Sequence, residues 1–375
     1  MDFELSDDQL ALRQAALGML DDLSPLTRVR QVAAMDAHLD TQLWQAMAEQ
    51  GWLSVELPAE AGGLGLGSVE LSVLAEQLGA HLAPVPFLGT VLTAGALQRA
   101  VSAKAADAAD ELAGRTVGQW IERLAEGSAV GALAWSTRAD SVSAATHEGG
   151  WHLSGRSDPV VYGPSADLVL VPAPATEGPA LFAAVPAERP RCEPAMDRTR
   201  SLGRAVLEDD RGLWLGGDDA LQALLDRAVT ALCAEMLGAA ERVLHMSVDY
   251  AKDRVQFGRP IGSFQAVKHR CADMLVDVEG MRSAAYYAAW AVGAGDPDAS
   301  AAASAAKVWC SEASRRVMAS GLQVHGGIGF TWEHDLHLFV KRAQLDQVSF
   351  GDSSAHRDRL ARILRPRAEA GLPVL

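Results

Sequence analysis

The sequence predicts an α+β fold, in which a helical N-terminal domain, a β-domain and a helical C-terminal domain follow one another along the chain. Apolar residues recur at helical spacing before about residue 128 and after about residue 218. Between these points, short apolar runs are separated by Gly, Pro, Asp and Ser, which is typical of strands. Helices and strands therefore occupy separate segments and do not alternate as in βαβ units.

Residues 1–127 form the predicted N-terminal helical domain. Ser6 stands before two acidic residues and fits the N-cap of a first helix, whose apolar stripe begins at Leu10. A second helix ends near Gly51. The glycine-rich string Leu57–Gly67 then separates it from a third, because Gly and Pro interrupt helices.

Residues 128–218 form the predicted antiparallel β-domain. The strand-like runs are Val130–Trp135, Trp151–Gly155, Asp167–Val171 and Leu181–Val185. Residues 219–375 form the predicted C-terminal four-helix bundle. Its first helix carries an apolar face from Leu221 toward Arg254, and Asp352 is placed to begin a final short helix.

Composition favours a cytoplasmic protein without a membrane span. Hydrophobic residues make up 49% of 375 residues, but no long apolar run occurs. The start, Met1–Asp8, is acidic where a signal peptide is basic. The four cysteines are dispersed without a CxxC pair, which favours free thiols over disulfides or a zinc site.

The net charge of −15 disfavours nucleic acid as a partner, because phosphate backbones require clustered Lys and Arg. The pair His334 and His337 lacks the order of a metalloprotease motif, so we expect no metal site there. Attraction of an anionic ligand therefore has to be local.

Two loops between long helices carry the residue types that suit a nucleotide cofactor. The first is Arg254–Gln265 and the second is Gln323–Gly329. An Arg suits a pyrophosphate, amide side chains suit a ribose or ring edge, and the pair Gly326 and Gly327 lets backbone amides approach a ligand. Turn chemistry alone also fits ordinary connections between helices.

Both strings, in this order, resemble the C-terminal domain of the acyl-CoA dehydrogenase family. The resemblance implies FAD bound mainly by a neighbouring subunit, an acyl-CoA substrate, and a homo- or hetero-tetramer with electron-transferring flavoprotein as the usual acceptor. The FAD-contacting residues carried over by position are Arg254, Phe257, Gln265, Gln323, Gly326 and Gly327. The string from Pro58 to Leu66 resembles the family's N-terminal domain, where it precedes a helix near the acyl-chain end of the pocket.

The middle section resembles the family's small β-domain from Trp151 to Ser157, but its flavin-facing parts differ. A family loop that reads Thr-Glu-Pro-x-Ala-Gly-Ser-Asp is replaced here by Ser136–Ser143. The family's Trp-Ile-Thr, which covers one face of the flavin, is replaced by Pro159–Val161.

The family's reaction removes a proton alpha to a thioester while hydride leaves the beta carbon for the flavin, so it needs a carboxylate base. By resemblance, the usual position of that Glu is Phe350, and the alternative position on the preceding long helix is Ala228. Neither residue accepts a proton. Asp226 matches a family Asp near the CoA moiety, and Asp352 is the nearest substitute for the base.

Three explanations remain open at this point. Asp352 acts as base after a shift in register, or another carboxylate is brought in by folding, or the chain is the base-lacking partner in a heteromeric acyl-CoA dehydrogenase and shares FAD with a catalytic homologue. Oxidase or monooxygenase chemistry on a retained flavin, and a helical scaffold without flavin, are the alternative functions.

Overall fold

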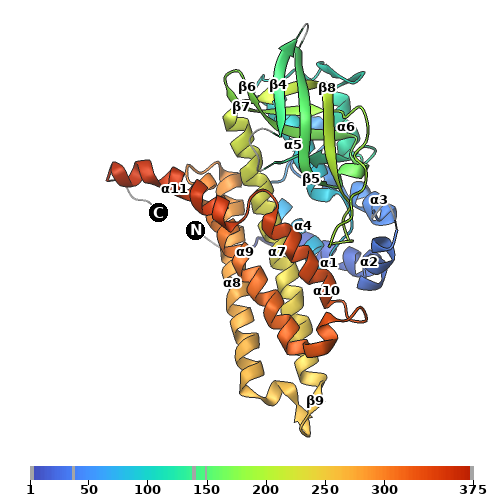
Figure 1. The fold of residues 1–375 in the computed structure, drawn as a ribbon, viewed down its shortest axis with the longest axis vertical. Coiled ribbons are helices and arrows are strands. Elements are labelled where there is room, and N and C mark those ends of the chain that lie inside the picture. Colours follow the sequence, from blue (N-terminus) through green and yellow to red (C-terminus); the bar gives the residue numbers. More distant parts are fainter. Residues whose placement is uncertain (1–3, 36–38, 137–140, 148–149, 372–375) are drawn as a thin grey trace. The chain divides into compact units, whose positions relative to one another are not determined.

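The computed structural model describes residues 4–35, 39–136, 141–147 and 150–371 (Figure 1). The chain forms two compact units. The first contains Met1–Val29, Ser68–Ala83 and Val229–Leu375, and the second contains Arg30–Gly67 and Pro84–Ala228. Each unit therefore draws on separate stretches of sequence. The division into 1–127, 128–218 and 219–375 stays a prediction.

The first unit is helical. Its helices are α1 (Asp7–Leu23), α4 (Ser68–Ala80), α7 (Asp218–Asp253, from Val229 onward), α8 (Gln265–Ala294), α9 (Ala299–His325), α10 (Leu336–Val348) and α11 (Ser353–Glu369). Two short 3-10 turns, η4 (Ile261–Ser263) and η5 (Gly326–Phe330), and the hairpin β9 (Val255–Gln256) with β10 (Arg259–Pro260), connect them. Ser6 caps α1 as predicted, in a reciprocal capping box with Gln9.

Helices α4 and α7 approach each other closely inside this unit because glycines face the contact. A Cβ added at Gly79 would lie 2.0 Å from the backbone O of Glu235, and one added at Gly238 would lie 1.8 Å from that of Glu76. Arg282 of α8 then links both helices, since it donates to Glu76 at 2.9 Å and to Glu241 at 2.7 Å. Close backbone packing and a shared arginine therefore fix α4 in the bundle.

The second unit joins helices to a β-sheet. Its helices are α2 (Leu26–Ala33, from Arg30 onward), α3 (Thr41–Glu49), α5 (Phe87–Ser102) and α6 (Val117–Ala125), with the first part of α7. Short 3-10 turns η1 (Trp52–Ser54), η2 (Ala59–Ala61) and η3 (Gly163–Ser165), and the hairpin β1 (Glu111–Leu112) with β2 (Arg115–Thr116), complete it.

The sheet of this unit has six strands in the order β3-β6-β7-β8-β5-β4. The strands are β3 (Gly131–Leu133), β4 (Val142–His147), β5 (Gly150–Val161), β6 (Leu168–Ala175), β7 (Gly178–Ala184) and β8 (Leu202–Gly216). Phe182, Val169 and Leu153 are among the fully buried residues of its core. The predicted α+β class, with helices on either side of the sheet segment in sequence, is confirmed.

The sheet corrects the sequence prediction in two ways. Strands β3 and β6 pair in parallel, because the β4 and β5 hairpin intervenes and returns the chain in the same direction, so the sheet is not wholly antiparallel. Strands β4 and β8 were not predicted. Strand β8 contains Glu208-Asp209-Asp210 and three glycines, which interrupt the apolar alternation that a strand prediction relies on. Pairing with both β5 and β7 stabilises it.

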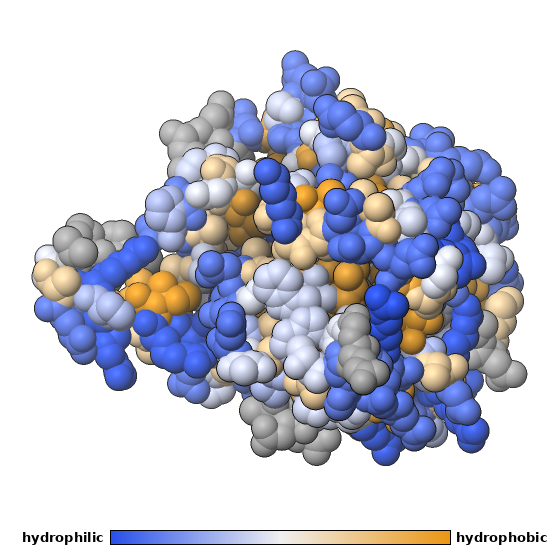
Figure 2. Space-filling view, turned by 90° about the horizontal axis from the view of Figure 1, so that it is seen from above, coloured by the Kyte–Doolittle hydropathy of each residue, from blue (hydrophilic) through white to orange (hydrophobic). Residues whose placement is uncertain are grey.

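One face of the molecule agrees with the charged composition. Figure 2 shows a face covered mainly by hydrophilic residues, between which hydrophobic residues form only small patches. Among the described residues, no helix is long and apolar enough to cross a membrane.

The close approach of α4 and α7 gives a test of the packing. Gly79→Ala should lower the free energy of unfolding by about 1–3 kcal/mol, because its Cβ meets rigid backbone. Gly18→Ala in α1 is the matched control, since its Cβ meets nothing within 4 Å. The control should be neutral or slightly stabilising in denaturant titrations. Equal stability of both variants would show that the two helices are not held this closely.

Candidate functional site

The first candidate loop begins where α7 ends and turns back through the β9 and β10 hairpin. Phe257 lies at the turn with φ of +53° and is 91% exposed. Its ring meets that of Phe264 edge to face at 6.1 Å, and the Arg259 guanidinium lies 4.2 Å from the Phe264 ring centroid. Contacts among these three side chains stabilise the loop, and the Phe257 ring stays exposed to solvent.

The polar residues of this loop are directed to solvent. Arg254 and Gln265 are exposed, and within the described residues the Arg254 guanidinium makes no hydrogen bond or ion pair. Arg254 is nevertheless fixed at its backbone, where its N–H donates to Tyr250 O at 2.9 Å and its carbonyl accepts from the Ile261 N–H at 2.8 Å. The loop therefore presents a positioned cation to solvent.

The second candidate loop follows α9 and is open at its glycines. Gly326 has φ of +63°, a conformation that favours glycine, and closes α9 by donating its N–H to Leu322 O. Gly327 does not adopt a positive φ. A Cβ added at Gly326 or at Gly327 would meet no atom within 4 Å. With Gln323 also exposed, backbone and amide groups remain accessible to a ligand here.

A ring stack brings the two loops together. Tyr250 lies one helical turn before Arg254, and its ring stacks on that of His325 at 4.6 Å with an angle of 24°. His325 directly precedes Gly326 and is buried. The structure therefore places both loops on one end of the first unit, as a shared ligand requires.

His325 is held in its neutral form. Its Nδ1 lies 2.8 Å from Gly321 O, so this nitrogen carries the proton and donates, while Nε2 is buried without a hydrogen-bond partner among the described residues. Burial lowers the pKa of His325, and the nearby ring of His334, with centroids 4.5 Å apart, lowers it further against the opposing effect of the bond to Gly321.

The position that the sequence predicts for the base holds a strained aromatic residue. Phe350 adopts φ of +59°, which is rare for a bulky side chain, and its backbone O contacts Nε2 of His356 at 3.0 Å. Asp352 is exposed and caps α11, where its Oδ1 accepts from the Ala355 N–H at 2.9 Å. Its carboxylate therefore has a structural role, and its catalytic role stays a prediction.

Buried charges lie in the helices that lead to this segment. Arg342 of α10 is fully buried and donates to Glu235 of α7 at 2.9 Å. Lys307 of α9 is also fully buried and donates from Nζ to the backbone O of Asp346 at 2.5 Å. Burial lowers the pKa of Lys307. Glu235 and Asp346 are thus both buried in the helix packing.

The remaining predicted residues belong to the second unit. Ala228 is fully buried, and its methyl group cannot take a proton. Asp226 is also buried, which differs from the solvated position that an acidic residue on a helix usually has. A contact of Asp226 with CoA stays a prediction.

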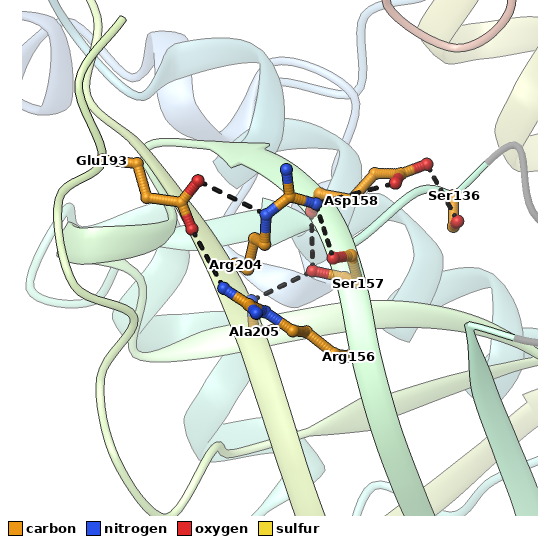
Figure 3. A network of polar contacts seen from close by, with 7 residues as sticks. All are labelled: Ser136, Arg156, Ser157, Asp158, Glu193, Arg204 and Ala205. Atoms are coloured by element: carbon orange, nitrogen blue, oxygen red, sulfur yellow. Dashed lines mark hydrogen bonds and ion pairs between the residues drawn. The ribbon is translucent and has the colours of Figure 1, made fainter.

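Next to the β-domain segments that differ from the family pattern, polar side chains form a network of internal contacts. Figure 3 shows Arg204 of β8 between Glu193 and Asp158, with Nε 3.3 Å from Glu193 and Nη1 3.7 Å from Asp158. Asp158 also accepts from Ser136 at 2.9 Å, and Arg156 lies 3.5 Å from Glu193. Residues 137–140 of the replaced loop lie outside the described residues. Of this loop, Ser136 joins the network through its hydrogen bond to Asp158.

Comparison with known proteins decides the family. The family model described as "Acyl-CoA dehydrogenase, N-terminal domain" matches residues 6–108, and "Acyl-CoA dehydrogenase, C-terminal domain" matches residues 216–364. The acyl-CoA dehydrogenase IpdE2 of Mycobacterium tuberculosis is 35% identical over 342 residues, which cover 90% of this chain and 91% of the relative. The chain belongs to the acyl-CoA dehydrogenase family. It is therefore an oxidoreductase of that family by descent and fold.

Other acyl-CoA dehydrogenases agree over nearly the whole chain. FadE27 of Mycobacterium tuberculosis is 31% identical and covers 97% of this chain and 99% of the relative. Among solved structures, the ChsE4-ChsE5 complex from Mycobacterium tuberculosis matches with a TM-score of 0.88 and 31% identity, and covers 97% of this chain and 99% of that chain. A variant of the Tcur3481-Tcur3483 steroid ACAD matches with a TM-score of 0.87 and 30% identity over the same shares.

The sequence does not single out Tyr250 or His325 as functional residues. Their pairing depends on how α7 and α9 pack, so spacing alone does not reveal it. Their place in the sequence could have indicated them, since Tyr250 and His325 each lie within one helical turn of a loop that carries cofactor motifs.

The lowered pKa of His325 predicts a pH dependence of stability. Because the folded state binds this proton more weakly than the unfolded state, the contribution is complete above the unfolded pKa of about 6.5 and is lost as pH falls below it. His325→Phe keeps an aromatic ring against Tyr250 and should weaken the decline in melting temperature between about pH 7.5 and pH 5. Exposed His269→Phe is the control, and an equal decline in wild type and His325→Phe would contradict the assignment.

Proposed function

We propose that this chain is a base-lacking subunit of a heteromeric acyl-CoA dehydrogenase, and that it shares FAD with a catalytic homologue. The observation that carries the proposal is a contrast within the first unit. The two loops with family cofactor motifs are intact, open and held together by the Tyr250 and His325 stack. The usual base position is Phe350, where no proton acceptor exists.

The residues present fit FAD at the two loops. Arg254 would pair with the pyrophosphate, Gln265 and Gln323 would contact polar edges, and Gly326 with Gly327 would admit the cofactor to the backbone. The accessible space at both glycines supports this assignment. When bound, FAD supplies the acceptor for the hydride that leaves the acyl chain. The chain's own residues bind and orient that cofactor.

Other parts of the chain support an incomplete site. The alternative base position, Ala228, is apolar and buried, and Asp352 is engaged as a helix cap. In the β-domain, Asp158 and Arg204 take part in ion pairs next to the place where the family's flavin-covering residues are replaced by Pro159–Val161. The catalytic carboxylate and most flavin contacts would therefore come from the partner subunit.

Relatives support the form of the assembly. One similar structure is the ChsE4-ChsE5 complex, which has two components. Another is a variant of the Tcur3481-Tcur3483 steroid ACAD, which is named for two components and for a steroid. We infer a hetero-tetramer that acts on an acyl-CoA ester, in the cytoplasm, with electron-transferring flavoprotein as acceptor. A steroid-derived or fatty acyl group is the substrate class that these names suggest.

Removal of Arg254 tests the cofactor role. In the complex of this chain with its catalytic homologue, Arg254→Ala should lower FAD occupancy at least about tenfold at limiting cofactor, because a charged hydrogen bond contributes about 1.5–3 kcal/mol. Flavin absorbance of the purified complex measures occupancy. Exposed Arg242→Ala on α7 is the control. Full occupancy in Arg254→Ala would contradict the assignment of the FAD pyrophosphate to Arg254.

Asp352 can be tested as a base without loss of its capping role. Asn caps helices about as well as Asp but cannot act as a base at neutral pH, so Asp352→Asn separates the two functions. We expect dehydrogenation by the complex to be unchanged within about twofold. A loss of kcat by a factor of about 100 or more, with an unchanged melting temperature, would favour a self-sufficient enzyme that uses Asp352.

Oxygen consumption distinguishes the proposed dehydrogenase from an oxidase or a monooxygenase. Turnover without an external electron acceptor would indicate oxidase or monooxygenase chemistry, whereas a dehydrogenase needs the acceptor. The same preparation of the complex serves for both measurements.

A further inference from the structure

An open cavity of about 540 Å³ lies within the second unit. Its lining comes from the turn η2, the last turns of α5 and one face of α6. Cavities of about 300–1,000 Å³ are the size that small molecules occupy in proteins. No residue assigned above to the cofactor or to the base lines this cavity. The cavity is therefore a candidate site for a separate ligand.

The floor of the cavity is apolar. Ile121 of α6 is buried, and Val101 of α5 and Ala125 of α6 are half-buried. Ile121 and Ala125 lie one helical turn apart on the face of α6 that lines the cavity. Hydrocarbon of a ligand would be removed from water on this floor, which stabilises binding.

The rim of the cavity is acidic. Glu60 belongs to η2, Glu122 belongs to α6, and Glu126 directly follows α6. All three side chains are exposed, so the cavity is open to solvent at its rim. Among the described residues, none of these carboxylates makes a hydrogen bond or an ion pair, and no Lys, Arg or His lines the cavity. The rim therefore carries three negative charges without a cation.

The ends of two helices add to this negative potential. Both α5 and α6 have their C-terminal turns at the cavity, where a helix dipole favours cations and disfavours acidic side chains. Glu122 and Glu126 are also one turn apart, a spacing at which like charges repel. Arg123 does not line the cavity, and its guanidinium donates to Ser128 O at 3.0 Å. A cation bound in the cavity would relieve both unfavourable effects.

The floor and the rim together restrict the ligand class. An anion is repelled by the rim, and a neutral apolar molecule leaves the carboxylates without a cation. A metal ion gains no contact with the floor, and among the described residues no group of three His, Cys, Asp or Glu side chains is placed to hold one. The lining consists of helices and turns, so it offers no strand edge to an extended peptide. Ammonium groups joined by methylene chains match both surfaces.

We propose that this cavity binds an aliphatic polyamine, a small organic cation with two or more ammonium groups. The methylene chain packs on the apolar floor, and the ammonium groups pair with the three carboxylates of the rim. The net charge of −15 also favours the approach of a polycation. The inference does not rest on the proposed function, because no residue of the cofactor loops takes part.

Three probes separate charge from apolar contact on the full-length chain. Diaminooctane has two terminal ammonium groups and a methylene chain, octanediol has the chain alone, and Mg²⁺ has the charge alone. In calorimetry at low ionic strength, diaminooctane should bind about tenfold or more tightly than either of the others. If Mg²⁺ binds as tightly as the diamine, attraction of counterions explains the result and the proposal is overturned.

Removal of two carboxylates locates the binding site. The double variant Glu122→Gln with Glu126→Gln should bind diaminooctane about fivefold or more weakly, because each exposed ion pair contributes modestly. The matched control is Glu177→Gln with Glu208→Gln, which removes the same charge at exposed positions of the same unit outside the cavity. The control should bind as wild type does. Unchanged affinity in the first variant, or an equal loss in the control, would refute the site.

A cavity-filling variant tests the floor without a change of charge. Ala125→Phe places a ring in the cavity and should weaken the binding of diaminooctane about tenfold or more. Wild-type affinity in this variant would mean that the diamine binds elsewhere. Diamine binding and FAD occupancy are measured separately, so failure of the polyamine site leaves the dehydrogenase proposal untouched.

Discussion

The stack of His325 on Tyr250 is the contact on which the cofactor end of this chain depends. It joins the end of α9 to the last turn of α7, and thereby brings the Arg254 loop beside Gly326 and Gly327. Neutral His325 suits this role, because its Nδ1 is used by Gly321 and a buried charge would cost stability. Two loops that are about 70 residues apart in sequence can therefore serve one ligand.

The same unit also encloses charged side chains in its helix packing. The Arg342 and Glu235 pair and the Lys307 contact to Asp346 hold α7, α9 and α10 together. Removal of one partner from such a buried pair leaves an unpaired charge, which costs about 3–5 kcal/mol. Glu235 is therefore part of the packing. Loss of the base with retention of the loops is the pattern expected of a subunit that binds cofactor while another supplies the proton acceptor.

Sequence reasoning predicted the α+β class, the helix caps at Ser6 and Asp352 and the two motif loops, because these depend on local pattern and turn chemistry. It missed β8, where acidic residues interrupt the apolar alternation, and the parallel pair of β3 with β6, which depends on the connection between distant strands. The stack of Tyr250 and the cavity beside α6 were also invisible, since both arise only when helices pack.

The most direct measurement is the flavin content of this chain purified alone and together with its catalytic homologue. The account predicts a colourless, inactive chain on its own, and a complex that holds about one FAD for each pair of unlike subunits. Absorbance at the flavin bands with protein quantification gives both values. A chain that alone retains about one FAD per polypeptide and dehydrogenates an acyl-CoA would contradict the central claim.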